Sequence, residues 1–543
     1  MLRIKGGRVY DPRNGWNGQV RDICIKDGKI VAGLPAGEEK ILDATGLVVM
    51  AGGVDIHAHI AGPKVNTGRV LCPEDHRQDP VPRTSRTRSG VGFNTPSTFV
   101  TGYRYAQMGY TSVMEAAMPP LEARHVHEEL ADIPILDKGA LVLVGNNHFV
   151  LNLIREGDRE RLKDYLSWLL DASGAYGLKV VNPGGGANWR RRGNVRGLDD
   201  EVIDYGVTPR QIIDTLLDIN EELGLPHALH LHCNNLGQPG NDRTTLATMA
   251  LAAGRRLHIT HLQFHAYRKG KKGFPLLSGA GGLAAVVNDH PNLTIDVGQV
   301  VFGPATTMTA DSPLQYELFR MGGGDRWVNK DIELETGSGI VPITYSPKSF
   351  VGACQWLIGL ELFLLIENPE QVFLTTDHPN AGPFTAYPQI IRLLMDRDYR
   401  EERIAQLPQK AVEASSIREL KREYTLAEIA AMTRSGPARV LGLKHKGHLG
   451  IGADADVVIY RPQPDYEAMF AHPLYVIKGG RLVVEEGKIL DPCPGKTFVP
   501  GLMEGRDVTP WLAPQFAQLY SIALENYPVE RERFSPWEVV PCS

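Results

Sequence analysis

Two histidines separated by one residue end an apolar run near the start of the chain. The run spans residues 49–59 and closes with His57, an alanine and His59. Residues two apart point to the same face of a strand, whereas in a helix they lie on different faces. Gly52 and Gly53 lie just before the histidines and allow the backbone to turn sharply into such a strand. This spacing predicts a strand that offers two imidazole nitrogens to a metal ion; the alternative is an HxH pattern on an ordinary strand.

A lysine in the middle of an apolar strand is the second chemical signal. Lys179 lies within Gly-Leu-Lys-Val-Val at residues 177–181. A buried ammonium is strongly disfavoured unless it is paired or modified. One interpretation is therefore a buried ion pair. The other is carbamylation by carbon dioxide, which converts the amine into a carboxylate able to bridge two metal ions.

Two further strand ends carry histidines. The sequence Leu-His-Leu-His at residues 229–232 is a second HxH pattern, so both imidazoles share one face and the spacing does not decide which one binds. We prefer His232 because it lies nearer the following loop, and His230 stays the alternative. His261 ends the next predicted strand, where a lone histidine is often structural.

A carboxylate ends the last of the predicted strands. Asp377 follows the strand-like residues 373–376. At this position it is able both to contact a metal ion and to serve as a catalytic base. The structural alternative is a helix cap, which is a common role for a strand-terminal aspartate.

The elements that must position these residues alternate between strand-like and helix-like segments. Such alternation is typical of a parallel α/β fold, and eight strands is the number of the (β/α)8 TIM-like barrel, whose catalytic residues lie at the carboxyl ends of its strands. The predicted strands are 54–59, 112–116, 141–144, 178–181, 228–232, 258–261, 293–297 and 373–376. The predicted helices are 98–108, 122–130, 159–170, 209–222 and 355–366, and a capping box opens another at Thr425.

The two chain ends carry similar short motifs. Residues 4–9 resemble residues 477–482, and residues 27–31 resemble residues 486–490. Hairpins commonly use such residues, but two similarities in the same order indicate one small β-domain built from both ends. The predicted parts of the chain are a composite β-sandwich domain (1–50 and 440–495), a barrel (51–439) and a C-terminal extension of unknown role (496–543). Long connections at 61–97, 182–207 and 298–349 are expected to form walls or lids on the catalytic face of the barrel.

The overall composition excludes several classes of function. The formal net charge of the 543 residues is -5, so the sequence gives no sign of nucleic-acid binding. Six cysteines are scattered without a CxxC pair, which favours reduced thiols over a disulfide framework or an iron–sulfur site. The first residues lack the apolar core of a signal peptide, and the apolar segment 356–366 is too short to span a bilayer. We expect a cytoplasmic protein without a membrane span.

Together the candidate residues form a pattern that is more specific than any one of them. Four histidines, one lysine and one aspartate at the predicted strand ends resemble the amidohydrolase superfamily, in its branch of hydantoinases and dihydroorotases. The resemblance implies two divalent metal ions, usually Zn²⁺, and an N-carboxylated lysine. The metal ligands that it implies are His57, His59, Lys179, His232, His261 and Asp377.

Longer stretches resemble one family of this superfamily, that of the amidohydrolase-like component of formylmethanofuran dehydrogenase and its bacterial counterpart in the formyltransferase/hydrolase complex. They are residues 53–62, 101–110, 114–120, 333–339 and 380–384, and the resemblance runs from the start to about residue 460. It implies hydrolysis of the N-formyl group of formylmethanofuran to formate and methanofuran. Asp377 would carry the proton from the attacking water to the departing amine. Partner subunits, among them a formyltransferase, are also implied.

Three alternatives stay open. The same site run backward condenses formate with methanofuran, as in the archaeal dehydrogenase, which would need separate redox subunits. A hydantoinase-like cyclic amidase is the second, and a metal-free structural protein of the same branch is the third. Every ligand position is filled, which argues against the structural protein. We favour the bacterial hydrolase because the chain is rich in arginine and poor in cysteine.

The resemblance implies a carrier with a glutamate-rich tail, and therefore a channel with cationic walls. Arginine suits this role because its planar guanidinium binds carboxylates bidentately. The predicted wall residues follow the first and fourth strands: Lys64, Arg69, Arg190, Arg191, Arg192 and Arg196. For each of them the alternative is a solvated surface charge.

Overall fold

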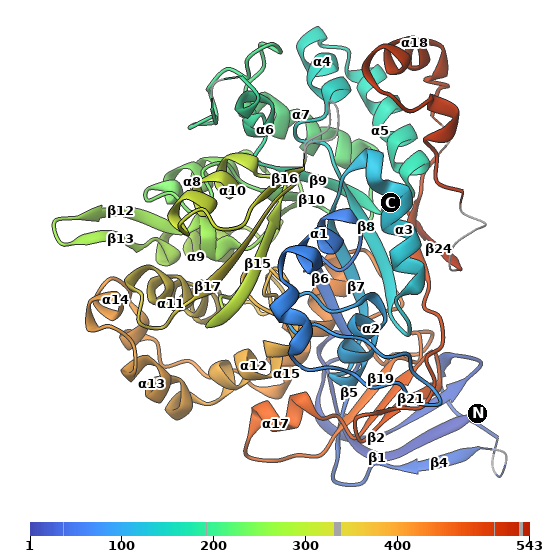
Figure 1. Cartoon of the computed structure of the whole chain (residues 1–543). Helices are drawn as coiled ribbons and strands as arrows, with labels where there is room; N and C mark the ends of the chain where they lie inside the picture. The colour runs from blue at the N-terminus through green and yellow to red at the C-terminus, as the bar shows by residue number, and fades with distance from the viewer. Residues whose placement is uncertain are drawn as a thin grey trace.

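Eight parallel strands form the centre of the molecule, and Figure 1 shows helices around them. The structure is a computed structural model that describes residues 1–35, 37, 39–191, 193–330, 338–503, 505–530 and 536–542. The strands are β6 (Gly53–Ala58), β7 (Tyr110–Met118), β8 (Asp137–Leu143), β9 (Gly177–Val181), β10 (Leu229–His232), β11 (Leu257–Ile259), β14 (Leu293–Asp296) and β18 (Val372–Phe373). Each predicted strand overlaps one of these, so the predicted TIM-like barrel is confirmed.

Hydrogen bonds between neighbouring strands close the barrel almost completely. Each strand pairs in parallel with the next, from β6 with β7 to β14 with β18. The first and last strands meet at a bridge between Ala58 and His378, where the His59 amide donates to the His378 carbonyl oxygen at 2.7 Å. Side chains that are far apart in sequence are thereby held at one end of the barrel.

Helices cover the barrel because each presents an apolar face to it. α7 (Pro209–Glu222) begins with a proline and a capping box between Thr208 and Gln211. α11 (Phe350–Leu365) begins before the predicted residue 355, because the Ser349 side chain accepts a hydrogen bond from the Gly352 amide. The predicted capping box at Thr425 opens α15 (Leu426–Ala430). Three further helices lie close to their predicted ranges: α2 (Thr98–Gln107), α3 (Ala123–Asp132) and α5 (Arg159–Ser173).

Strands from both ends of the chain build a second sheet, which lies at the bottom of Figure 1. The strand β5 joins the two ends, because it pairs in parallel with β1 and antiparallel with β19. The N-terminal strands are β1 (Leu2–Asp11), β2 (Trp16–Lys26), β3 (Lys29–Val31), β4 (Lys40–Asp43) and β5 (Val48–Ala51). The C-terminal strands are β19 (Val457–Tyr460), β20 (Tyr475–Lys478), β21 (Arg481–Glu485) and β22 (Lys488–Ile489).

The similar motifs at the two ends are only partly equivalent in structure. Residues 27–28 and 486–487 both turn between strands with positive φ angles. Residues 479–480 also form a turn, whereas residues 6–7 lie inside β1 at a bulge. The separate short strands expected before and after residues 6–7 are therefore one strand, because a glycine accommodates the bulge without ending the pairing.

The C-terminal extension packs against the barrel. Its strand β23 (Thr497–Gly501) continues the barrel sheet next to β8, and β24 (Trp537–Pro541) pairs in parallel with β23. The helix α18 (Thr509–Leu519) lies near α4 (His148–Glu156) and α5, where the ring of Trp511 is 6.1 Å from that of Phe149. The Val529 amide also donates to the Ala172 carbonyl oxygen at 2.7 Å.

The three long connections contain regular structure. α1 (Pro63–Leu71) follows the first barrel strand and α6 (Gly185–Trp189) follows the fourth. The third connection forms a small antiparallel sheet in the order β15-β17-β16, with α10 (Ser312–Met321) beside it. These strands are β15 (Gly303–Thr309), β16 (Val328–Lys330) and β17 (Ser338–Tyr345). Residues 333–337 of the quoted resemblance, and Arg192, lie outside the described residues. Among the described helices, none is both long and apolar enough to cross a membrane.

Candidate metal centre

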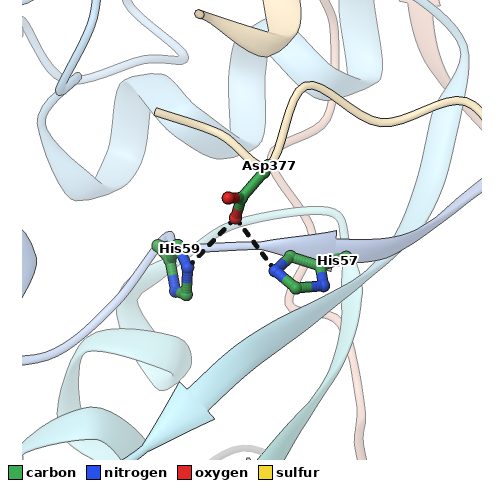
Figure 2. Close-up of side chains that lie close together, drawn as sticks. All are labelled: His57, His59 and Asp377. Atoms are coloured by element: carbon green, nitrogen blue, oxygen red, sulfur yellow. Dashed lines mark ion pairs between the residues drawn. The ribbon is translucent and has the colours of Figure 1, made fainter. Parts of the chain in front are cut away.

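Three predicted ligands converge where the first and last barrel strands meet, as Figure 2 shows. His57 Nε2 lies 2.9 Å from Asp377 Oδ1, and His59 Nε2 lies 3.3 Å from the same oxygen. The imidazoles come from the carboxyl end of β6, and the carboxylate follows β18. All three side chains are buried, so their charges are weakly screened by solvent.

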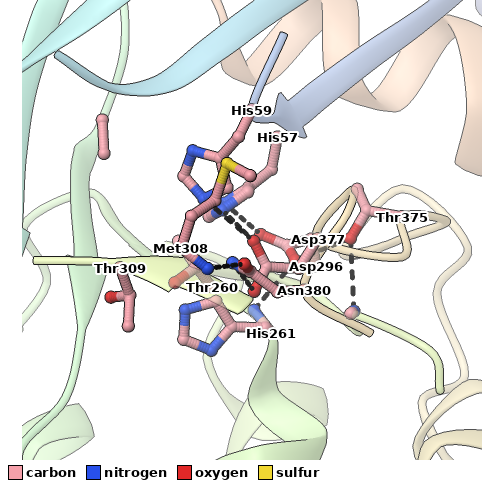
Figure 3. Close-up of polar contacts among 12 residues, drawn as sticks. His57, His59, Thr260, His261, Asp296, Met308, Thr309, Thr375, Asp377 and Asn380 are labelled. Carbon is pink, nitrogen blue, oxygen red and sulfur yellow. Dashed lines mark hydrogen bonds and ion pairs between the residues drawn. The ribbon is translucent and has the colours of Figure 1, made fainter. Parts of the chain in front are cut away.

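The other predicted ligands line the same cavity. Its volume is about 350 Å³, and its walls include Lys179, His232 and His261 together with the three residues above. The ring of His261 lies 5.5 Å from that of His57 and 4.7 Å from that of His232. Figure 3 shows His261 facing His57 and Asp377. The rest of the wall is largely apolar and includes Leu236, Phe264, Tyr267, Leu276, Ile343 and Tyr345.

His230, the alternative to His232, lies outside this cavity. Its Nε2 is 2.9 Å from His57 Nδ1, on the side of His57 that faces away from Asp377. His232 lines the cavity and places Nε2 3.1 Å from Asp311 Oδ2. The two histidines share a face of β10, but only the one nearer the loop reaches the cavity.

Lys179 has little that would stabilise a positive charge. Its Nζ lies 3.4 Å from Thr260 Oγ1, and among the described residues no carboxylate oxygen lies within 4.0 Å of it. Burial therefore lowers the pKa of Lys179 to about 7, although Asp296 and Asp377 oppose the shift. The geometry does not supply the partner that the ion-pair interpretation requires.

Glu115 on β7 is a functional residue that the sequence reasoning missed. It accepts hydrogen bonds from the backbone amides of Ile60 and Ala61, at 2.7 and 3.0 Å. His59 Nδ1 lies 3.3 Å from Glu115 Oε1, and Lys64 Nζ lies 2.7 Å from it. Burial favours the neutral acid, but Lys64 and His59 lower the pKa of Glu115 to about 2. A carboxylate behind a ligand histidine orients its ring, and a glutamate inside the apolar segment 110–118 was the available signal.

Asp296 is the second carboxylate that was missed. Its Oδ1 accepts from the His261 amide and from Thr375 Oγ1, both at 2.8 Å. Its Oδ2 lies 3.1 Å from His258 Nε2 and 3.3 Å from His57 Nδ1. Burial would raise the pKa of Asp296, but the two imidazoles lower it well below its usual range. Asp296 ends β14, so its position after an apolar strand matched that of Asp377.

Two predicted wall residues are wrong. Lys64 is only 2% exposed and its ammonium is occupied by Glu115, so it does not face a channel. Arg69 donates to the Pro96 carbonyl oxygen at 3.0 Å and to Asn66 Oδ1 at 2.6 Å, within its own loop region. Sequence alone does not distinguish a loop cation that pairs with a buried carboxylate from one that faces solvent.

The donor atoms of the cavity fit a divalent metal ion. His57 Nε2, Asp377 Oδ1 and His261 Nδ1 are buried and have no hydrogen-bond partner of good geometry. Burial opposes charge on Asp377, yet His261 and His57 lower its pKa well below the usual value, so it is an ionised ligand. Imidazole nitrogens with a carboxylate oxygen are a common donor set for Zn²⁺ and related ions.

Comparisons with known proteins agree with this fold and site. The profile of the amidohydrolase family matches residues 40–484. Protein FwdA of Methanocaldococcus jannaschii is 47% identical, over 99% of this chain and 98% of its own. The A-type component of the formyltransferase/hydrolase complex Fhc of Methylorubrum extorquens is 44% identical, over 92% of this chain and 91% of its own.

Solved structures give the same result. The crystal structure of the formyltransferase/hydrolase complex FhcABCD from Methylorubrum extorquens in complex with methylofuran matches with a TM-score of 0.94 at 41% identity, and each chain is covered completely, at 100%. The zinc-containing N-acyl-D-glutamate deacylase of Bordetella bronchiseptica shares the fold, with a TM-score of 0.51 at 16% identity over 91% of this chain and 98% of that one. From its profile and its long relatives, the chain belongs to the amidohydrolase family.

Proposed function

We propose that the chain is the hydrolase subunit of a cytoplasmic formyltransferase/hydrolase complex. Its substrate is the N-formyl amide of a methanofuran-type carrier, and the products are formate and the free amine. The observation that carries this proposal is the full-length structural match to a chain of the FhcABCD complex, whose crystal structure contains methylofuran. The cavity supports it independently, because six residues able to bind metal line one apolar-walled site.

The proposed cofactor is a pair of divalent metal ions, with Zn²⁺ preferred. The residues that would hold it are His57, His59, His232, His261, Asp377 and N-carboxylated Lys179. When bound, such ions polarise the formyl oxygen and lower the pKa of a water molecule from about 15.7 to about 7. The lowered pKa of Lys179 supports carboxylation, because only the neutral amine adds to carbon dioxide.

The side chains of the cavity account for proton transfer and orientation. Asp377 accepts a proton from the attacking water and returns it to the amine nitrogen, because an amine anion is too poor a leaving group. Asn380 Nδ2 donates to Asp377 Oδ2 at 2.9 Å, which leaves Oδ1 directed at the two histidines of β6. The apolar wall excludes bulk water and suits the aromatic end of the carrier.

A surface groove continues from the cavity and suits the carrier tail. It has a volume of about 630 Å³ and shares Leu236, Gln238 and Leu314 with the cavity wall. Arg196 lines the groove, and Arg190 and Arg191 are exposed nearby on the same connection. Neutralising these arginines should raise KM for the full-length carrier and leave kcat nearly unchanged. An equal loss of activity on a truncated formyl-furfurylamine would exclude the tail-binding role.

The direct test is formate release by the purified metal-loaded complex from an N-formyl methanofuran-type carrier. We expect one formate for each free amine, and a matched Asp377→Asn complex should be nearly inactive. Metal-loaded complex that releases no formate, but opens a cyclic amide, would establish the hydantoinase alternative. Co-purifying molybdenum or tungsten and iron–sulfur subunits would instead establish the dehydrogenase alternative, for which the 47% identity to archaeal FwdA is the favouring observation.

A further inference from the structure

A row of three imidazoles runs from His57 away from the cavity. His57 Nδ1 lies 2.9 Å from His230 Nε2, and His230 Nδ1 lies 2.8 Å from His227 Nε2. The row ends at the Val440 carbonyl oxygen, 3.1 Å from His227 Nδ1. All three rings are buried, and neither His227 nor His230 lines the cavity. The mechanism proposed above uses neither of them.

The carbonyl at the end of the row determines where each hydrogen lies. A carbonyl oxygen only accepts, so His227 Nδ1 must carry a hydrogen. Burial lowers the pKa of His227 to about 3, so its ring is neutral and its Nε2 accepts from His230 Nδ1. The buried His230 ring then has a lone pair on Nε2, which accepts from His57 Nδ1. Each step has one donor and one acceptor, and the opposite order fails at Val440.

We propose that His230 and His227 are positioning residues that fix His57 with its hydrogen on Nδ1, so that its Nε2 lone pair faces the cavity. The inference rests on the proposed function, because it assigns that lone pair to a metal ion. Asp296 Oδ2, at 3.3 Å from His57 Nδ1, favours the same tautomer. It already contacts His258 Nε2 at 3.1 Å, so His230 is the closer acceptor for His57.

Two other roles for the row fit less well. A proton path needs an end that takes up or releases a proton, and this row ends at a backbone carbonyl oxygen. A metal ion between His57, His230 and Asp296 is geometrically possible, because three of their donor atoms lie within 4.8 Å of one another. That ion would require His57 Nδ1 without its hydrogen and would break the row at its first contact.

His227 gives the sharpest test because it touches neither His57 nor the cavity. His227→Leu removes the acceptor for His230 Nδ1, whereas His227→Gln keeps one, since its Oε1 replaces Nε2. His227→Phe removes the acceptor but keeps the ring, and the exposed His472→Leu is the matched control. Zn²⁺ affinity is measured by chelator competition on the full chain in its complex, and thermal unfolding of the metal-free protein checks folding.

We expect the Leu and Phe variants to bind Zn²⁺ about 10- to 100-fold more weakly, the usual effect of losing an outer-shell partner. His227→Gln and the control should stay close to the unmodified protein. Equal Zn²⁺ affinity in the Leu, Phe and Gln variants, whether normal or weak, would overturn the inference. A third Zn²⁺ in the unmodified chain that His230→Leu loses would also overturn it. If the proposed function itself were wrong, the unmodified chain would bind no Zn²⁺.

Discussion

The barrel cavity and the junction between the barrel and the second sheet each bury a cluster of charged groups. At the junction, Lys446 Nζ lies 2.5 Å from Asp137, 2.7 Å from Asp454 and 2.8 Å from Asp456. In the cavity, Asp377 Oδ1 lacks a well-formed hydrogen bond. The difference teaches that a cluster whose charges neutralise one another is complete as folded, whereas donor atoms that face one point without partners require a ligand.

The two buried lysines express this difference most clearly. Burial disfavours charge on both, but Asp137, Asp456 and Asp454 raise the pKa of Lys446 well above its usual value. Around Lys179 burial prevails and the pKa falls to about 7. One lysine is therefore a fixed cation, whereas the other is a neutral amine near physiological pH.

Removing Lys179 should have the largest effect on activity. Lys179→Ala deletes the proposed bridging carboxylate, so the protein should lose its metal ions and its turnover together. A short-chain carboxylate that fills the space should restore part of both. Metal analysis and formate release, with and without added propionate, measure this. Full metal content in the unrescued variant would show that Lys179 is not a ligand.

The next largest effect is expected for Asp377→Asn. The amide still offers an oxygen but no longer carries a proton, so most of the metal should remain. Turnover should fall by about two to four orders of magnitude, the range for a lost general acid or base. Formate release at matched metal content is the measurement. Near-normal turnover would leave Asp377 with only the structural role of a helix cap.

The same substitution at the two lysines sharpens the comparison in stability. Lys446→Met leaves buried carboxylates without their cation, so the free energy of unfolding should fall by about 3–5 kcal/mol. Lys179→Met removes a buried amine without an ionic partner, so the stability of the metal-free protein should change little or rise. Urea unfolding of both metal-free variants compares them. Equal destabilisation would contradict the distinction between the clusters.

The smallest predicted effect is on acid stability. Burial favours protonation of Asp454, but Lys446 and Lys29 lower its pKa to about 2. A carboxylate whose pKa is lower in the folded state stabilises the protein above its unfolded pKa of about 3.9, and this contribution is lost as the pH falls toward the folded value. The urea midpoint of metal-free protein should therefore drop between about pH 4 and pH 2. Asp454→Asn should make this drop shallower, and an unchanged slope would contradict the assignment.

Local sequence patterns were enough to predict the barrel. Alternating strands and helices indicated all eight barrel strands, because each buried parallel strand is a short apolar run between helix signals. The spacing of His57 and His59 placed both imidazoles on one face of β6, since that periodicity is a local property of a strand.

Contacts between distant segments were beyond the sequence. Glu115 faces His59 and Lys64 because β7 pairs beside β6, and no local pattern in either segment identifies that partnership. The sequence also left His230 and His232 equivalent, since their difference lies in depth along the barrel. The long connection of residues 298–349 was predicted as an irregular wall, but β15 and β17 pair across residues distant in sequence.

A crystal structure of the zinc-loaded complex, with an anomalous difference map, tests the central claim most directly. The account predicts two Zn²⁺ ions among His57, His59, His232, His261 and Asp377, with additional density of a carboxylate on Lys179 Nζ between them. An unmodified Lys179 in a well-resolved map of fully metallated protein would contradict the carboxylate bridge. Zinc bound outside this cavity would contradict the assignment of the cluster as a metal centre.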